Sequence, residues 1–189
     1  MKQKELNTFE HLDNIMNTIQ DLIDVKQDFT GFVMCCLAIE FLGSFSDEKT
    51  FDESNSTNRF KNGLDHFKNS KYNMHKNLLY KELRGGLVHQ LRPLETLFLT
   101  SHSVHNANKE DHLSTNKESK VIIVLEQLFE DLKDAIKKFK NKLKKPNHSF
   151  DRKKIEAKHI IITEINIPDS ESDAYFGTGH TLTNRTKII

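Results

Sequence analysis

The chain has 189 residues, with 28 Lys and Arg against 27 Asp and Glu, ten His, two Cys, three Pro, seven Gly and no Trp. This length suits one domain with extensions, and such a domain buries roughly 70% of the surface of its unfolded chain. A formal charge of +1 excludes a protein that is basic throughout, although it remains compatible with a local basic patch.

The sequence predicts a cytoplasmic protein with no membrane partner. Residues 1–20 carry scattered charges and no apolar core, unlike a signal peptide. The most apolar stretch, 29–45, contains Glu40 and is shorter than the roughly 20 apolar residues of a membrane span. Cys35 and Cys36 are adjacent and form no disulfide framework, which favours a reducing compartment.

Three prolines and seven glycines leave long uninterrupted stretches, which favours helices. Apolar residues recur at helical spacing over 6–23, which predicts the first helix. A second helix is expected over 30–45; it is apolar on nearly every side and should therefore be central. A polar linker over 44–57 separates it from a shorter helix that contains Phe60, Leu64 and Phe67 and ends near residues 69–70.

The next helix is predicted over 73–91, before Pro93, because leucines recur at every fourth position there. These leucines are Leu79, Leu83, Leu87 and Leu91. Residues 100–120 form a polar loop, and the last helix is expected over 121–143, ahead of Pro146.

Beyond Pro146 the composition changes. Residues 159–167 are rich in β-branched side chains and predict a strand, followed by a loosely ordered tail. Because a lone strand leaves its edges unpaired, we expect it to pair with a tail hairpin or with another chain. The predicted fold is thus an all-α bundle of about five helices over 1–146, with a C-terminal extension over 147–189.

Adjacent Gly85 and Gly86 lie inside a predicted helix, where each costs about 1 kcal/mol relative to alanine. They lie one turn before His89, and Glu82 and Arg92 fall on the same side of the helix. The glycines either clear space beside His89 for a ligand or a second helix, or they serve close helix packing beside a surface histidine.

Arg84, followed five residues later by His89, is similar to the Arg-x(4–6)-His motif of HEPN (higher eukaryotes and prokaryotes nucleotide-binding) domains. The chain resembles that family in its helical setting over about 5–145, its apolar second helix and its Lys-rich last helix. The resemblance implies a HEPN-like bundle and a homodimer packed around the Gly85–Gly86 face, in which two motif copies line one cleft. It further implies a metal-independent endoribonuclease in a prokaryotic defence or toxin–antitoxin setting.

In such an enzyme, the resemblance implies that His89 is the general acid or base at the 2′-hydroxyl or the leaving 5′-oxygen. Histidine titrates near neutral pH, which suits this work. Arg84 would hold the scissile phosphate through its planar set of donors. No metal and no cofactor are expected. The first alternative is a non-catalytic HEPN-like dimer that binds a nucleotide or a partner protein, such as an antitoxin; the second is a structural dimer joined through the C-terminal strand.

Glu40 interrupts the apolar second helix, where a lone carboxylate should be paired or protonated. We expect it to reach Arg84 or Lys81 and to orient the motif arginine. The alternative is that Glu40 lies on a narrow solvated edge of the helix.

Residues 137–158 hold ten basic and two acidic side chains, a local charge of +8 in a chain of +1. Such a patch predicts salt-dependent RNA binding through Lys137, Lys140 and Lys144. The alternative is a solvated helix end whose lysines complement the helix dipole, because no aromatic side chains lie between them to stack on bases.

Overall fold

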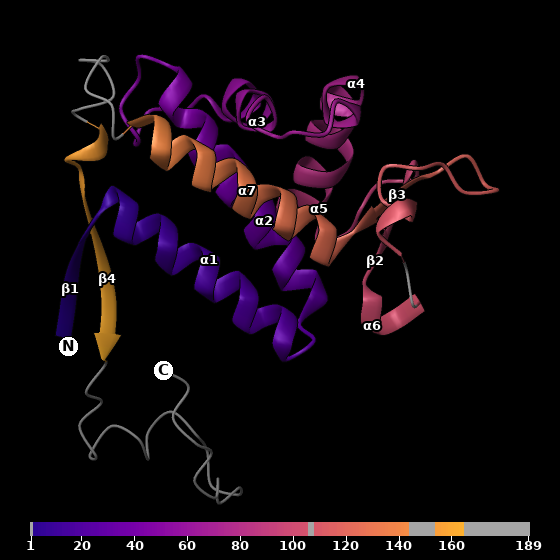
Figure 1. The fold of residues 1–189 in the computed structure, drawn as a ribbon, viewed down its shortest axis with the longest axis horizontal. Helices are drawn as coiled ribbons and strands as arrows, with labels where there is room; N and C mark the ends of the chain where they lie inside the picture. Colours follow the sequence, from indigo (N-terminus) through magenta and orange to yellow (C-terminus); the bar gives the residue numbers. More distant parts are fainter. Residues whose placement is uncertain (1, 106–107, 144–153, 165–189) are drawn as a thin grey trace, which may run out of the picture.

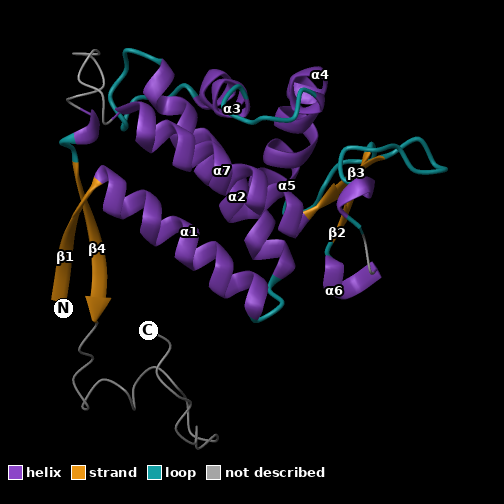
Figure 2. Cartoon of the chain, in the orientation of Figure 1, coloured by secondary structure: helices purple, strands orange, loops and turns teal. Residues whose placement is uncertain are grey.

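The computed structural model describes residues 2–105, 108–143 and 154–164. Over these residues the chain is mostly helical with a few short strands, which confirms the predicted predominance of helix (Figures 1 and 2). The helices are α1 Thr8–Asp24, α2 Asp28–Gly43, α3 Ser56–Leu64, α4 Lys71–Leu78, α5 Gly85–Gln90, α6 His102–His105 and α7 Leu125–Leu143. The strands are β1 Lys2–Asn7, β2 Leu97–Thr100, β3 Val121–Val124 and β4 Lys158–Glu164.

Helix α2 is central, as its composition predicts, and contacts α1, α3 and α7 (Figure 1). The stretch 28–46 is long and apolar enough to cross a membrane, yet more than half of it is buried in this bundle. Helices α2 and α3 meet backbone to backbone at two glycines. A Cβ atom on Gly43 would lie 1.7 Å from the carbonyl oxygen of Arg59, and one on Gly63 would lie 2.0 Å from that of Ile39. This crossing therefore has no room for any side chain larger than hydrogen.

The C-terminal strand pairs differently from the prediction. Strand β4 pairs antiparallel with β1, from the first residues of the same chain, a partner that the prediction did not include (Figure 1). Residues 2–7 also correct the first predicted helix, which begins only at Thr8. Asn7 caps that helix by accepting hydrogen bonds from the backbone N–H groups of Phe9 and Glu10, so the chain before it is free to extend. Positions 165–167 of the predicted strand lie outside the described residues.

Lys154 fixes the segment before β4 to the bundle. Its ammonium donates to the carbonyl oxygens of Ser44 and Asp47 and to the carboxylate of Asp47. Arg59 reaches the same carboxylate from α3, with Nε 2.7 Å from Oδ2. Burial alone would raise the pKa of Asp47, but the hydrogen bonds from Arg59, Asn55 and Lys154 outweigh it and hold that pKa well below its usual range. The C-terminal extension thus contributes residues to the bundle itself.

A second pair of strands replaces the predicted start of the last helix. Val121–Val124 forms β3, parallel to β2, and the helix begins at Leu125. Four consecutive β-branched residues favour this extended conformation, since their side chains are restricted in a helix. The chain between the two strands spans 101–120, long enough for the crossover that parallel strands require.

A buried chain of hydrogen bonds ties β3 to α4 and α7. The Val124 N–H group donates to Nδ1 of His112 at 3.0 Å, so Nε2 carries the proton and donates to the Tyr72 hydroxyl at 2.8 Å. That hydroxyl donates to Oδ2 of Asp131 at 2.9 Å. Burial lowers the pKa of His112 to about 4, and burial together with Asp131 raises the pKa of Tyr72. The imidazole is therefore neutral in the folded protein at neutral pH.

The neutral His112 makes the stability of the fold depend on pH. A histidine whose pKa is lower in the folded state stabilises the fold above pH 6.5, and that contribution is lost as the pH falls towards 4. Between pH 6.5 and 4, the wild-type protein should lose about 3 kcal/mol of unfolding free energy through His112. We expect His112→Asn, which keeps an acceptor for Val124, to abolish this loss. Urea unfolding of both proteins across this range measures the difference, and parallel pH profiles would contradict it.

Candidate functional site

Arg84 and His89 lie on one continuous helical segment, in which the number of residues per turn changes along its length. Between α4 and α5, Leu79–Arg84 forms a π-helical turn, in which the Gly85 N–H group bonds to the carbonyl oxygen of Tyr80. The segment ends at Leu91, whose φ of 55° is left-handed, close to the predicted end. Such turns are rare and recur at functional sites.

Arg84 joins three elements at the motif. Its Nε atom donates to Oε2 of Glu40 on α2 at 2.9 Å, and its Nη1 atom lies 2.8 Å from Nε2 of His89. The contact expected between Glu40 and Arg84 is therefore present, whereas Lys81 pairs with Glu82. Arg84 is buried and His89 is exposed. The guanidinium is therefore held in place, and the imidazole bonded to it faces solvent. We call Glu40, Arg84 and His89 the motif cluster.

The hydrogen bond within the motif fixes the state of His89. A guanidinium only donates, so Nε2 of His89 accepts and the ring is neutral, with its proton on Nδ1. The arrangement offers an N–H donor at Nδ1 and holds a potential base at Nε2 beside a cation. These are the groups needed to move protons next to a bound anion.

Tyr80, which the sequence gave no reason to select, lies at the edge of this cluster. Its hydroxyl is 3.4 Å from that of Ser56 on α3. Hydrogen bonds from Ser56 and Thr57, together with the charge of Arg84, lower the pKa of Tyr80. Its position four residues before Arg84 was the available signal, because residues at that spacing share a helix face.

The cysteines lie behind the site, in the core. Burial raises the pKa of Cys36 to about 12, against a smaller opposing effect of Arg84. Burial also raises the pKa of Cys35. Both side chains are therefore neutral thiols and supply no nucleophile to the motif cluster.

The two glycines differ in what surrounds them. A Cβ atom on Gly86 would lie 2.6 Å from the carbonyl oxygen of Arg92, because the chain folds back over that face after Leu91. A Cβ atom on Gly85 would meet only the Tyr80 carbonyl oxygen, at 3.4 Å. The Gly86 face is thus filled by the chain's own return segment, 92–94, which corrects the expectation of a ligand or a second helix there.

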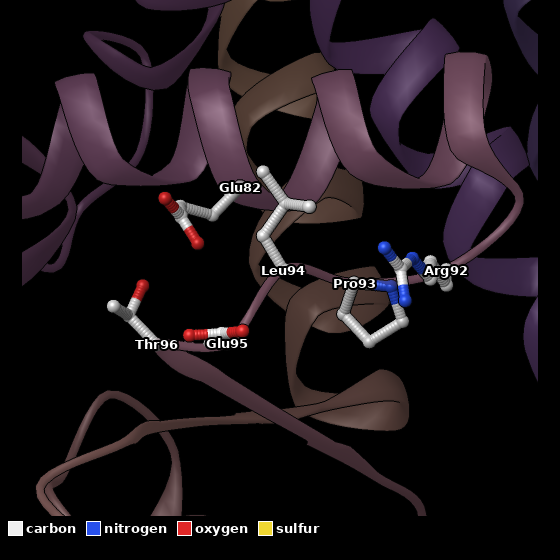
Figure 3. A pocket seen from close by; sticks show the side chains of 6 residues that line it. All are labelled: Glu82, Arg92, Pro93, Leu94, Glu95 and Thr96. Atoms are coloured by element: carbon white, nitrogen blue, oxygen red, sulfur yellow. The ribbon is translucent and has the colours of Figure 1, made fainter.

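Glu82 and Arg92 lie together, but in a separate cavity of about 320 Å³ that neither Arg84 nor His89 lines (Figure 3). Pro93, Leu94, Glu95 and Thr96 complete its lining. The cavity lies between the π-helical turn and the chain that returns beneath it (Figure 3). Two backbone hydrogen bonds hold the return, from Arg92 to Gly86 and from Leu94 to Glu82, both at 3.3 Å.

The predicted RNA-binding lysines are not equivalent. Lys137 is exposed on α7, whereas Lys140 pairs with Asp13 on α1 at 2.6 Å and lies over the ring of Phe9. Lys144 lies outside the described residues. Within the described part of the chain, Lys137 and Lys140 make no contact with the motif cluster. Lys140 therefore contributes to the packing of α1 on α7.

No protein-family model, curated protein or solved structure matches this chain.

The surroundings of the two glycines predict opposite effects of the same substitution. We expect Gly86→Ala to lower the free energy of unfolding by about 1–3 kcal/mol, because the return segment must move. Gly85→Ala is its matched control and should raise stability by up to about 1 kcal/mol through helix propensity. Chemical denaturation of both variants measures this, and equal effects would rule out the close approach at Gly86.

Proposed function

We propose that the chain is a HEPN-like, RNA-directed protein that cleaves RNA without a metal ion. The observation that carries the proposal is the 2.8 Å contact between Arg84 and His89, with Arg84 held by Glu40. A guanidinium binds a phosphate through paired donors, and a neighbouring imidazole moves protons at the reacting oxygens. Helix α5 supplies His89, and the turn before it supplies Arg84.

The proposed reaction is an internal transfer at phosphorus. The RNA 2′-oxygen attacks the adjacent phosphorus, the bond from phosphorus to the 5′-oxygen breaks, and a 2′,3′-cyclic phosphate and a 5′-hydroxyl form. A bound phosphate draws the Nη1 donor of Arg84 away from His89, which frees Nε2 to take the proton of the 2′-hydroxyl. A second copy of His89, contributed by a dimer partner and protonated at Nε2 from solvent, gives that proton to the leaving 5′-oxygen, and exchange with solvent then restores both imidazoles.

Cleavage of mixed RNA in EDTA tests this proposal. We expect Arg84→Ala and His89→Ala to lose about 100-fold or more of the cleavage rate, the usual loss for an acid–base group. Arg84→Lys should also be impaired, because an ammonium lacks the planar set of donors. His75→Ala on α4 is the matched histidine control and should cleave normally.

The chemistry of the ends decides the outcome of that experiment. Ends with 2′,3′-cyclic phosphate support the proposed reaction. Cleavage that survives both alanine substitutions would contradict it. A folded wild-type dimer without cleavage would favour the alternative, a non-catalytic HEPN-like dimer that binds a nucleotide or a partner protein.

The proposed partner is a second copy of the chain, docked beside the motif cluster. Helix α2 exposes Phe29 and Leu37 on one stripe, and Leu91 is exposed two residues after His89. Leu37 lines a small cavity together with Glu40, so this apolar surface borders the motif cluster. Burying such a surface in a dimer would bring two copies of the motif together and supply both proton-transfer groups.

A charged residue on this surface tests the dimer. We expect Leu37→Glu to lower the association state in sedimentation experiments and to reduce cleavage with it, because the carboxylate would be buried without a partner. Met74→Glu on α4 is the matched control, since Met74 is equally apolar and is 73% exposed. Loss of association in the control, or none in Leu37→Glu, would reject this surface.

A further inference from the structure

The cavity beneath the π-helical turn has acidic side chains at one end and a basic side chain at its mouth. Glu82 points across the cavity towards Glu95 and Thr96, and Arg92 lies at the other end beside Pro93 (Figure 3). Leu94 lies between the two ends (Figure 3). The lining thus combines two carboxylates, an apolar middle and one guanidinium within about 320 Å³. This volume is in the range of small-ligand sites.

Glu82 is the unusual member of this lining. The residue is only 8% exposed, and no donor among the described residues makes a hydrogen bond to its carboxylate. It forms an ion pair with Lys81 at 3.7 Å, and the side chain of that lysine is 77% exposed. The carboxylate faces the cavity with its lone pairs available, so the site favours a ligand that supplies hydrogen-bond donors.

Arg92 is the complementary group. Its side chain is exposed, and within the described residues it makes no ion pair or hydrogen bond. The backbone at Arg92 is nevertheless fixed, because its N–H group donates to the carbonyl oxygen of Gly86. A guanidinium on a fixed backbone at the mouth of a cavity is suited to a phosphate group.

From these groups we infer that the cavity binds a guanine nucleotide, with Glu82 accepting from the base and Arg92 contacting the phosphate. Guanine is the RNA base that presents two adjacent donors, N1–H and the exocyclic amino group, which match the two oxygens of one carboxylate. Adenine and cytosine pair one donor with a ring-nitrogen acceptor, and uracil has a single N–H group between two carbonyl groups. A carboxylate therefore discriminates in favour of guanine.

The cavity and the motif cluster are built on the same backbone. Glu82 precedes His89 by seven residues, roughly 10 Å along a helix, and both lie on the segment that the return chain braces. A guanosine within RNA has a phosphate on each side, so one of them would contact Arg92 while the other, the cleaved phosphate, contacts Arg84. The assignment of this nucleotide to RNA rests on the proposed function; the binding of guanine does not.

Isothermal titration of the full chain with 5′-GMP, 5′-AMP, 5′-CMP and 5′-UMP tests the inference. We expect GMP to bind roughly tenfold more tightly than the other three, which is the discrimination that one bidentate pair supplies. Glu82→Gln should abolish the preference, because the amide offers one acceptor where the carboxylate offers two. Glu48→Gln, an exposed acid-to-amide change elsewhere, is the matched control and should leave binding unchanged.

A second variant keeps the test valid if Glu82→Gln fails to fold. Arg92→Gln changes an exposed side chain and should weaken GMP without weakening guanosine, since guanosine has no phosphate. Equal binding of all four nucleotides, no binding of GMP, or GMP binding that is insensitive to both variants would overturn the inference. Binding of L-arginine methyl ester in place of GMP would overturn it in favour of a cationic side chain from a protein.

Sequencing the RNA ends separates this inference from the proposed function. If the wild type cleaves next to guanosine and Glu82→Gln cleaves at any sequence, the result supports guanosine in RNA as the ligand. Selective GMP binding by wild type and His89→Ala, with no RNA cleavage by either, would support a site for a free guanine nucleotide and contradict the ribonuclease. Cleavage with no preference for guanosine in the wild type would contradict the RNA form of the inference.

Discussion

The ion pair between Glu40 and Arg84 constrains the rest of the structure. Both side chains are largely buried, and taking two charges out of water is offset only by close pairing and further hydrogen bonds. Helix α2 must therefore present Glu40 opposite the one turn that carries Arg84. The packing of α1, α3 and α7 around α2 fixes the first partner, and the π-helical turn fixes the second. His89 receives its hydrogen bond from the same guanidinium, so its position depends on the pair.

The π-helical turn reconciles two demands on one helical segment. Leu79, Leu83 and Leu87 are all buried and must face the core at successive turns. Arg84 must meanwhile reach Glu40, while Glu82 points into the cavity on another side. A wider turn adds a residue to the helix without breaking it, which shifts the later side chains relative to the earlier ones. Gly86 then admits the return segment, so the turn, the glycine and the cavity form one unit.

Local patterns in the sequence were sufficient to locate the main helices, though not where the first and last begin, and to suggest the pairing of Glu40 with Arg84. The leucine spacing located the segment around Arg84, and an isolated carboxylate in α2 required a cation that Arg84 could provide. The pairing of β1 with β4 was not predictable in this way, because its partners lie more than 150 residues apart and nothing local selects one edge over another. Asn7 both ends β1 and caps α1. A single residue is too short a signal to mark this boundary, because the apolar spacing typical of the helix already includes Leu6. The partner of Gly86 was equally hidden, since it depends on how the chain folds back after Leu91.

The distribution of charge bears on how such a molecule would hold RNA. Nonspecific binding of a nucleic acid scales with the number of phosphates that free cations neutralise. The chain has a formal charge of +1, Lys140 is committed to Asp13, and Lys154 is committed to Asp47. These two lysines are therefore less available to phosphates, and contacts that recognise particular groups at short range gain in importance. The guanidinium that Glu40 holds at Arg84, the exposed guanidinium of Arg92 and the carboxylate of Glu82 that faces the cavity are groups of that kind. They lie on one braced segment of about ten residues, so recognition of a base and chemistry at a phosphate would be coupled through a single rigid backbone.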